Sequence, residues 1–181
     1  QKVSRPFASE MPTGISFMVS PTILPTDKIR GMTMPASPQM LSAKSKELGF
    51  DTIGFASPDL PIDAAEGLHE FIGSGHHGDM GWMADKAHLR ASPRSLWPEA
   101  QSVIVLGHNY GPDFNPLEKL AHKTTGNISC YALNNDYHDV IKKKLKQFAR
   151  WMVEEFACDV KVFVDTAPVM EKPLAQAAGI G

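Results

Sequence analysis

The chain has 181 residues, of which 43% are hydrophobic and 21% charged, and its formal net charge is −2. This is the composition of an ordinary globular domain with its own core, and the charge argues against a strongly basic nucleic-acid clamp. No apolar run reaches the roughly 20 residues needed to span a bilayer, so we expect no membrane partner. The two cysteines, Cys130 and Cys158, form neither a Cys-x-x-Cys pair nor a dense framework, which favours a cytoplasmic location.

Residues 1–38 contain six prolines and no sustained helical or strand periodicity. This pattern predicts a disordered, proline-rich leader attached to a folded domain at 39–181. The chain starts at Gln1 and stops at Gly181, within what we interpret as a motif. We therefore expect a fragment of a longer protein.

The first half of the domain mixes helices with one strand. We expect a helix over 39–48 that ends at Gly49, a strand over 50–55 and a second helix over 64–72. The stretch 73–83 is punctuated by glycines but lacks the Gly-Lys-Ser/Thr of a phosphate-binding loop. A flexible loop is the better interpretation of it.

The second half is more regular. A nearly continuous apolar run over 102–107 is typical of a central strand buried on both faces. Apolar residues recur every three or four positions over 137–156 and predict a long amphipathic helix. A strand over 160–164 and a helix over 168–178 follow. Helices and strands alternate, so we predict an α/β fold with a mixed or mostly parallel sheet flanked by helices.

Asp165 stands directly after the last predicted strand, in the run Val162-Phe163-Val164-Asp165. Ligands of open α/β sheets bind outside the carboxyl ends of the strands, where Asp165 is expected. A carboxylate that is half buried behind β-branched residues is a candidate for a raised pKa and for acid–base chemistry. The alternative is that Asp165 only caps the next helix.

His138 lies between Asp136 and Asp139 where the long helix begins. Asp136 is well placed as the N-cap, and His138 is either a pocket residue or a capping-region histidine without chemistry. The seven histidines show no His-Glu-x-x-His or Cys/His ligand spacing, so we expect no metal site. These residues support an α/β pocket protein with a carboxylate at its mouth.

Six segments, in order along the chain, resemble the epoxyqueuosine reductases. They run from His-Gly-Asp-Met-Gly-Trp-Met-Ala through Asp-Tyr-His-Asp-Val and Val-Asp-Thr-Ala-Pro to Ala-Gly-Ile-Gly, at positions 77–84, 90–100, 102–112, 136–140, 164–168 and 171–181. Together they are highly specific for this family. The leader lies outside the resemblance.

The resemblance implies a cobalamin-dependent enzyme that removes the epoxide oxygen of epoxyqueuosine at the wobble position of tRNA. In that family a cobalamin- and substrate-binding α/β domain precedes a module with two [4Fe-4S] clusters. We expect this chain to hold only the first part, truncated and inactive alone, because the cluster motifs are absent. The implied partners are tRNA and an electron donor, and we expect a monomer.

The resemblance also implies roles for single residues. Asp165 matches the acid that protonates the oxygen as the epoxide opens. Arg90 and Cys130 match positions near the corrinoid, and the motif formed by Asp136, Tyr137 and His138 lines the pocket. One departure is that Asn134-Asn135 replaces a glycine and a basic residue before that motif.

Two other interpretations compete with a reductase. The chain is a corrinoid-binding or carrier module without catalysis of its own, or it is an unrelated flavin- or nucleotide-binding domain. The second has little support, because the sequence contains no dinucleotide fingerprint.

Overall fold

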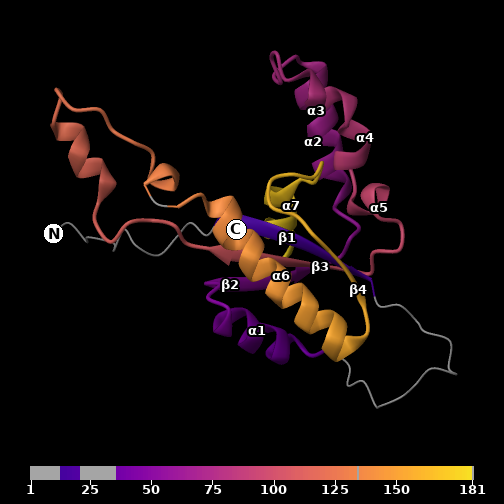
Figure 1. Cartoon of the computed structure of the whole chain (residues 1–181). Helices are drawn as coiled ribbons and strands as arrows, with labels where there is room; N and C mark the ends of the chain where they lie inside the picture. Colours follow the sequence, from indigo (N-terminus) through magenta and orange to yellow (C-terminus); the bar gives the residue numbers. More distant parts are fainter. Residues whose placement is uncertain (1–12, 21–35, 134, 181) are drawn as a thin grey trace, which may run out of the picture.

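The computed structural model describes residues 13–20, 36–133 and 135–180. Within them lies one four-stranded sheet (Figure 1), with the strand order β2-β3-β1-β4. The strands are β1 (Thr13–Ser20), β2 (Thr52–Ala56), β3 (Ser102–His108) and β4 (Asp159–Val162). Every pair of neighbours in this sheet is antiparallel.

The prediction of helices around a sheet is confirmed, but the prediction of a mixed or mostly parallel sheet is wrong. β3 and β4 do run in the same direction, because both pair antiparallel with β1. They do not pair with each other, since β1 lies between them. The apolar run of β3 indicates that the strand is buried on both faces. Burial does not determine the direction of a neighbouring strand, so the run could not distinguish a parallel from an antiparallel sheet.

The disordered leader is wrong for residues 13–20, which form the inner strand β1. The sequence there places Ile15, Phe17 and Val19 at alternating positions, which is the period of a strand. The many prolines around this segment obscured that short pattern. The remainder of the predicted leader up to residue 35 lies outside the described residues.

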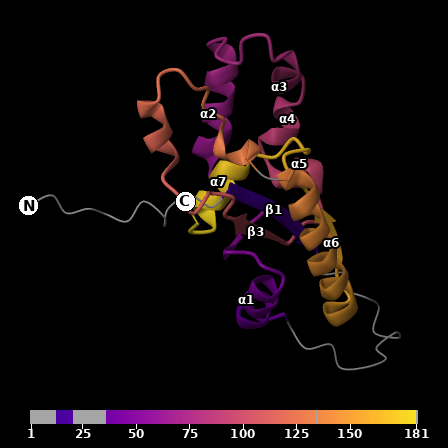
Figure 2. The ribbon, with the colours of Figure 1, turned by 60° about the vertical axis from the view of Figure 1, so that its left-hand side comes forward.

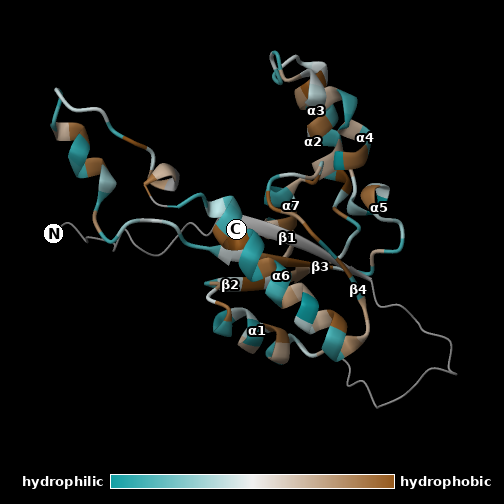
Figure 3. Cartoon of the chain, in the orientation of Figure 1, coloured by the Kyte–Doolittle hydropathy of each residue, from teal (hydrophilic) through white to brown (hydrophobic). Residues whose placement is uncertain are grey.

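Two hydrophobic clusters cover the two faces of β3. Ile104 and Leu106 belong to the cluster around α1 and α6, and Val103 and Val105 belong to the cluster around α7. All four side chains are buried, so the prediction of a strand buried on both faces is confirmed. Figure 3 shows the apolar residues of β2 and β3 beside α6, whose exposed side is hydrophilic.

Helix α6 (Tyr137–Phe156) has the bounds that the sequence predicts. The Asp136 side chain caps it by accepting a hydrogen bond from the backbone N–H of His138. The apolar stripe packs against the sheet and includes Ile141, Leu145, Phe148 and Met152. The helix ends at Ala157, whose φ of 49° is left-handed.

The other helices of the described residues comprise three that lie within a few residues of their predicted bounds and three short ones over 81–96 that were not predicted. They are α1 (Pro38–Glu47), α2 (Ile62–Gly73), α3 (Gly81–Asp85), α4 (Ala87–Arg90), α5 (Pro93–Leu96) and α7 (Glu171–Ala177), with 3₁₀ turns η2 (Pro116–Ala121) and η3 (Cys130–Ala132). The predicted loop over 73–83 contains the start of α3.

Helices α2, α3 and α4 rise beyond one end of the sheet, whereas residues 111–133 extend away from it (Figures 1 and 2). Helix α7 packs against β1, β2 and β3. In the described part of the chain, no helix is both long and apolar enough to cross a bilayer. The candidate site lies where α3 and α4 face the segment between β4 and α7.

Candidate functional site

A cavity of about 440 Å³ opens beside the segment that follows β4. Trp82, Lys86 and Arg90 line one side, and residues 165–169 line the other together with Glu171 and Lys172. The volume is in the range of small-molecule pockets. The lining combines three cations with two carboxyl groups, so the cavity suits a polar ligand that carries acceptor groups or negative charge.

Asp165 lies at the mouth of this cavity, three residues beyond the end of β4. Its side chain is 36% exposed. Its backbone φ of 51° is left-handed, which is uncommon for a residue other than glycine. Helix α7 begins only at Glu171, with Met170 as its N-cap, so the alternative that Asp165 caps this helix is wrong.

Two residues from the start of α6 contact the Asp165 carboxylate. The Tyr137 hydroxyl donates a hydrogen bond of 2.6 Å to Oδ2, and Nε2 of His138 lies 3.7 Å from the same oxygen. The hydrogen bond to Asp165, followed by burial, raises the pKa of the Tyr137 phenol. Tyr137 therefore stays protonated and acts as a fixed donor to Asp165.

Asp136 holds the His138 ring in turn. Oδ1 of Asp136 lies 2.9 Å from Nδ1 of His138 and accepts the His138 backbone N–H at 2.9 Å. These contacts, the backbone one first, lower the pKa of Asp136. The rings of Tyr137 and His138 stack with their centroids 4.1 Å apart. The Asp-Tyr-His motif is thus linked by its own contacts, and two of its residues contact Asp165.

Glu171 is the first residue of α7 and approaches Asp165 from the other side. Its Oε1 accepts a hydrogen bond of 3.3 Å from the Asp165 backbone N–H. Burial first, and then the hydrogen bonding and negative charge of the Asp165 side chain, raise the pKa of Glu171 to about 8. Glu171 is therefore mostly protonated at neutral pH.

Arg90 and Trp82 form the opposite wall. The Arg90 guanidinium lies over the indole ring, 4.9 Å from its centroid, in a cation–π contact. Nε of Arg90 is buried and has no hydrogen-bond partner among the residues that the structure describes. A buried donor without an acceptor is costly, so this atom marks where a ligand acceptor fits.

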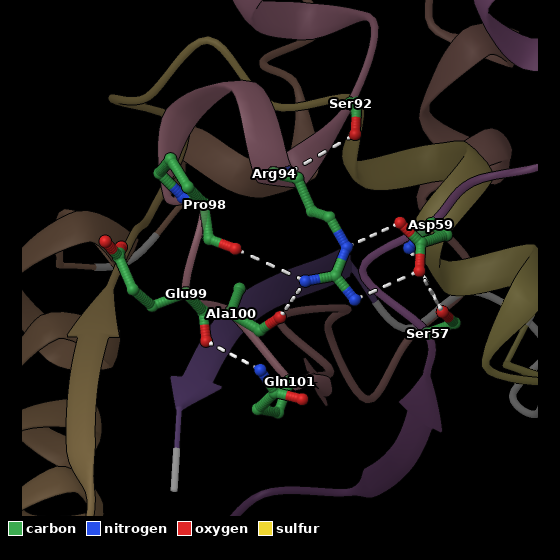
Figure 4. A network of polar contacts seen from close by, with 8 residues as sticks. All are labelled: Ser57, Asp59, Ser92, Arg94, Pro98, Glu99, Ala100 and Gln101. Carbon is green, nitrogen blue, oxygen red and sulfur yellow. Dashed lines mark hydrogen bonds and ion pairs between the residues drawn. The ribbon is translucent and has the colours of Figure 1, made fainter. Parts of the chain in front are cut away.

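Arg94 anchors the segment that carries Arg90 (Figure 4). Its guanidinium makes a two-pronged ion pair with Asp59, at 2.6 and 3.1 Å, and donates to the carbonyl oxygens of Pro98 and Ala100. Helices α4 and α5 pack against each other. The network thereby ties the Arg90 wall to the loop after β2 and to the turn before β3.

The structure brings most of the predicted site residues together. Asp165 and Arg90 line the cavity, Tyr137 and His138 contact Asp165, and Asp136 acts through His138. Cys130 begins η3 and does not line the cavity, so its place near a cofactor stays a prediction. Asn134 lies outside the described residues.

Among the charged and aromatic residues of the cavity, sequence reasoning missed four, namely Trp82, Lys86, Glu171 and Lys172. All except Lys86 stand inside the segments that resemble the reductases. The resemblance was therefore the available signal, but no local pattern distinguishes a cavity residue from its neighbours. In the described residues no three His, Cys, Asp or Glu side chains are placed to hold a metal ion.

Comparisons with known proteins confirm the resemblance. Residues 90–166 match the family described as epoxyqueuosine reductase QueG, DUF1730. The chain is 37% identical over 150 residues to the epoxyqueuosine reductase of Cyclobacterium marinum, covering 82% of this chain and 47% of the relative. It is 34% identical over 156 residues to that of Escherichia coli, covering 83% and 41%.

A third relative, the epoxyqueuosine reductase of Leadbetterella byssophila, is 41% identical over 136 residues, which cover 75% of this chain and 43% of the relative. The chain thus spans less than half the length of the curated relatives it matches. No solved structure matches it.

Proposed function

We propose that this chain, a relative of the epoxyqueuosine reductases over 82% of its length, forms the substrate- and cofactor-binding part of such an enzyme. The reaction is the reduction of epoxyqueuosine to queuosine at the wobble position of tRNA. The observation that carries the proposal is the cavity in which Asp165, fixed by Tyr137, faces the unpaired Nε of Arg90. The two free cysteines suit a cytoplasmic enzyme.

The reaction defines what the site has to supply. Removing an epoxide oxygen breaks both of its C–O bonds, takes up two electrons and two protons, leaves a carbon–carbon double bond and releases water. The electrons come from an external electron donor. Asp165 supplies a proton to the oxygen as the first C–O bond breaks, which is general acid catalysis.

The residues of the cavity fit the edge of cobalamin. The unpaired Nε of Arg90 suits the amide carbonyls around a corrin ring, and Lys86 and Lys172 add two cations to the same lining. Bound cobalamin would supply the redox chemistry of its cobalt. The protein side of the reaction is to hold the substrate oxygen near Asp165 and to deliver protons there.

The residues of this chain do not fit iron–sulfur clusters. Each [4Fe-4S] cluster takes four cysteine thiolates, and this chain has two cysteines in all. We therefore propose that residues outside these 181 hold the clusters. The second candidate function is a corrinoid-binding module without catalysis of its own. The cysteine count is the one observation that favours it.

The test separates cofactor binding from proton donation. Cobalamin binding to the 181-residue chain is followed by visible absorbance for the unaltered chain, Arg90→Met and Asp165→Asn. Epoxide reduction is then measured with the same variants in the complete reductase. Asp113→Asn, an exposed aspartate outside the cavity, is the matched control.

We expect Asp165→Asn to keep cobalamin binding and to lose at least about a hundredfold in turnover, the usual worth of a general acid. We expect Arg90→Met to weaken binding and Asp113→Asn to change neither. Undiminished turnover by Asp165→Asn removes Asp165 from the acid role. Cobalamin binding with no turnover by the unaltered complete protein favours the carrier module.

A further inference from the structure

We propose that Glu171 holds the second proton of the reduction and passes it to Asp165. The inference rests on the proposed function, because it assigns Glu171 to the site in which Asp165 is the acid. Glu171 is not proposed to touch the substrate. It acts through Asp165, as a positioning and proton-supplying partner.

The number of protons requires such a partner. The epoxide oxygen leaves as water and so takes two protons, but a single carboxylic acid gives only one. After the first proton moves to the oxygen and the first C–O bond breaks, Asp165 is a carboxylate. The second C–O bond breaks with a second proton, which moves from Glu171 to Asp165 and then to the departing oxygen, while an external electron donor provides both electrons.

The geometry places the carboxyl of Glu171 beside Asp165. Its carboxyl lines the same cavity as Asp165, and its Oε1 lies 3.3 Å from the Asp165 backbone nitrogen. Burial, together with the Asp165 carboxylate that remains after the first transfer, keeps Glu171 protonated, and an acid that titrates near the working pH transfers its proton most effectively.

The other ionisable groups around the pair are less suitable donors. The Tyr137 phenol is held protonated by its hydrogen bond to Asp165. Nε2 of His138 lies 3.7 Å from Asp165, and the other ring nitrogen is engaged by Asp136. The cations Lys86, Arg90 and Lys172 line the same cavity as the pair.

A purely structural role for Glu171 makes different predictions. Its Oε1 fixes the backbone N–H of Asp165, which has a left-handed φ. Glutamine keeps this acceptor oxygen but carries no acidic proton, whereas alanine loses both. Comparing Glu171→Gln with Glu171→Ala therefore separates the proton from the backbone contact.

The first measurement titrates the side-chain carboxyls of the 181-residue chain by ¹³C NMR. We expect one glutamate to titrate near pH 8, to vanish from the spectrum of Glu171→Gln and to titrate at lower pH in Asp165→Asn. Glu66→Gln, an exposed glutamate of α2, is the control and leaves that signal in place. If every glutamate titrates below about pH 6, the proposal is overturned.

The second measurement is the pH profile of single-turnover epoxide reduction in the complete reductase. We expect the unaltered enzyme to lose activity as pH rises through about 8. Glu171→Gln is expected to be at least about tenfold slower at pH 7 and to lack that decline, while Glu171→Ala is slower still. A Glu171→Gln enzyme with the unaltered rate and profile overturns the proposal, whereas failure of the proposed function appears separately, as an Asp165→Asn enzyme that still turns over.

Discussion

The hydroxyl of Tyr137 donates a 2.6 Å hydrogen bond to Oδ2 of Asp165, and this contact joins the first turn of α6 to the segment after β4. The two residues are 28 positions apart in the chain. The tyrosine holds the carboxylate at the mouth of the cavity. Because the phenol donates to the Asp165 side chain, the contact raises the pKa of Tyr137.

Asp165→Asn is expected to lower the pKa of Tyr137 back toward its ordinary value of 10. The carboxylate raises that pKa, because a phenolate beside it loses its hydrogen bond and meets a like charge. Tyrosinate absorbance between about pH 9 and 12, the range in which free tyrosines titrate, measures the change.

The chain has three tyrosines, so Tyr137→Phe identifies which part of the titration belongs to Tyr137. In the unaltered chain one tyrosine should ionise later than the others, and this late step should be missing from Tyr137→Phe. An identical titration for Asp165→Asn and the unaltered chain contradicts the hydrogen bond.

Glu171 makes the stability of the fold decrease with rising pH. Its pKa is about 8 in the folded chain and 4.5 as the reference value, so folding takes up a proton between these values. Its contribution is fully present below pH 4.5 and is lost as pH rises through about 8, by at most about 1.4 kcal/mol per pH unit. Urea unfolding of the unaltered chain and Glu171→Gln between pH 5 and 9 measures this slope.

Glu171→Gln should flatten the slope, because glutamine has the uncharged form at every pH. It should therefore be the more stable variant at pH 9, while the two differ least at pH 5. Parallel stability curves for the two chains would show that Glu171 is ionised in the folded state.

Local patterns predicted those parts of the fold that depend on short-range physics. The bounds of α6 follow from the Asp136 cap and from an apolar stripe of helical period. The burial of β3 follows from its apolar run. The place of β1 does not, because strand pairing between residues 13–20 and 102–108 is a long-range choice that no local pattern encodes.

The candidate site also contains residues that local patterns predict and residues that they do not. The sequence singles out Asp165 because this residue follows a predicted strand. The raised pKa of Glu171 depends on burial and on the neighbouring Asp165, which only the folded chain provides. Trp82 and Arg90 come together because α3 and α4 fold against each other, and sequence spacing alone does not show this contact.

Gly54→Ala should destabilise the fold and disturb α7. A methyl group on Gly54 of β2 would collide with the carbonyl oxygen of Ala178 and lie 2.9 Å from Cγ1 of Ile180. The chain has to move at the end of the helix that begins with Glu171, so we expect a loss of about 1–3 kcal/mol. Gly67→Ala is the control, because it has open space within α2 and should be about 0.5–1 kcal/mol more stable.

Chemical denaturation gives both values, and the NMR titration of Glu171 shows whether α7 has moved. We expect the Glu171 signal to shift in Gly54→Ala and to stay unchanged in Gly67→Ala. Equal stability of Gly54→Ala and the unaltered chain would mean that α7 does not pack this closely on β2.

Arg94→Lys should lower the melting temperature although it keeps the charge. Lysine cannot reproduce the planar fork that binds both oxygens of Asp59 and at the same time reaches the carbonyl oxygens of Pro98 and Ala100. The segment with α4 and α5 then loses its anchor, so cobalamin binding through Arg90 should weaken as well. Arg150→Lys, on the exposed side of α6, is the matched control. A thermal melt and a cobalamin titration measure the two effects, and an Arg94→Lys chain that matches Arg150→Lys in both would show that the fork does not hold the Arg90 wall in place.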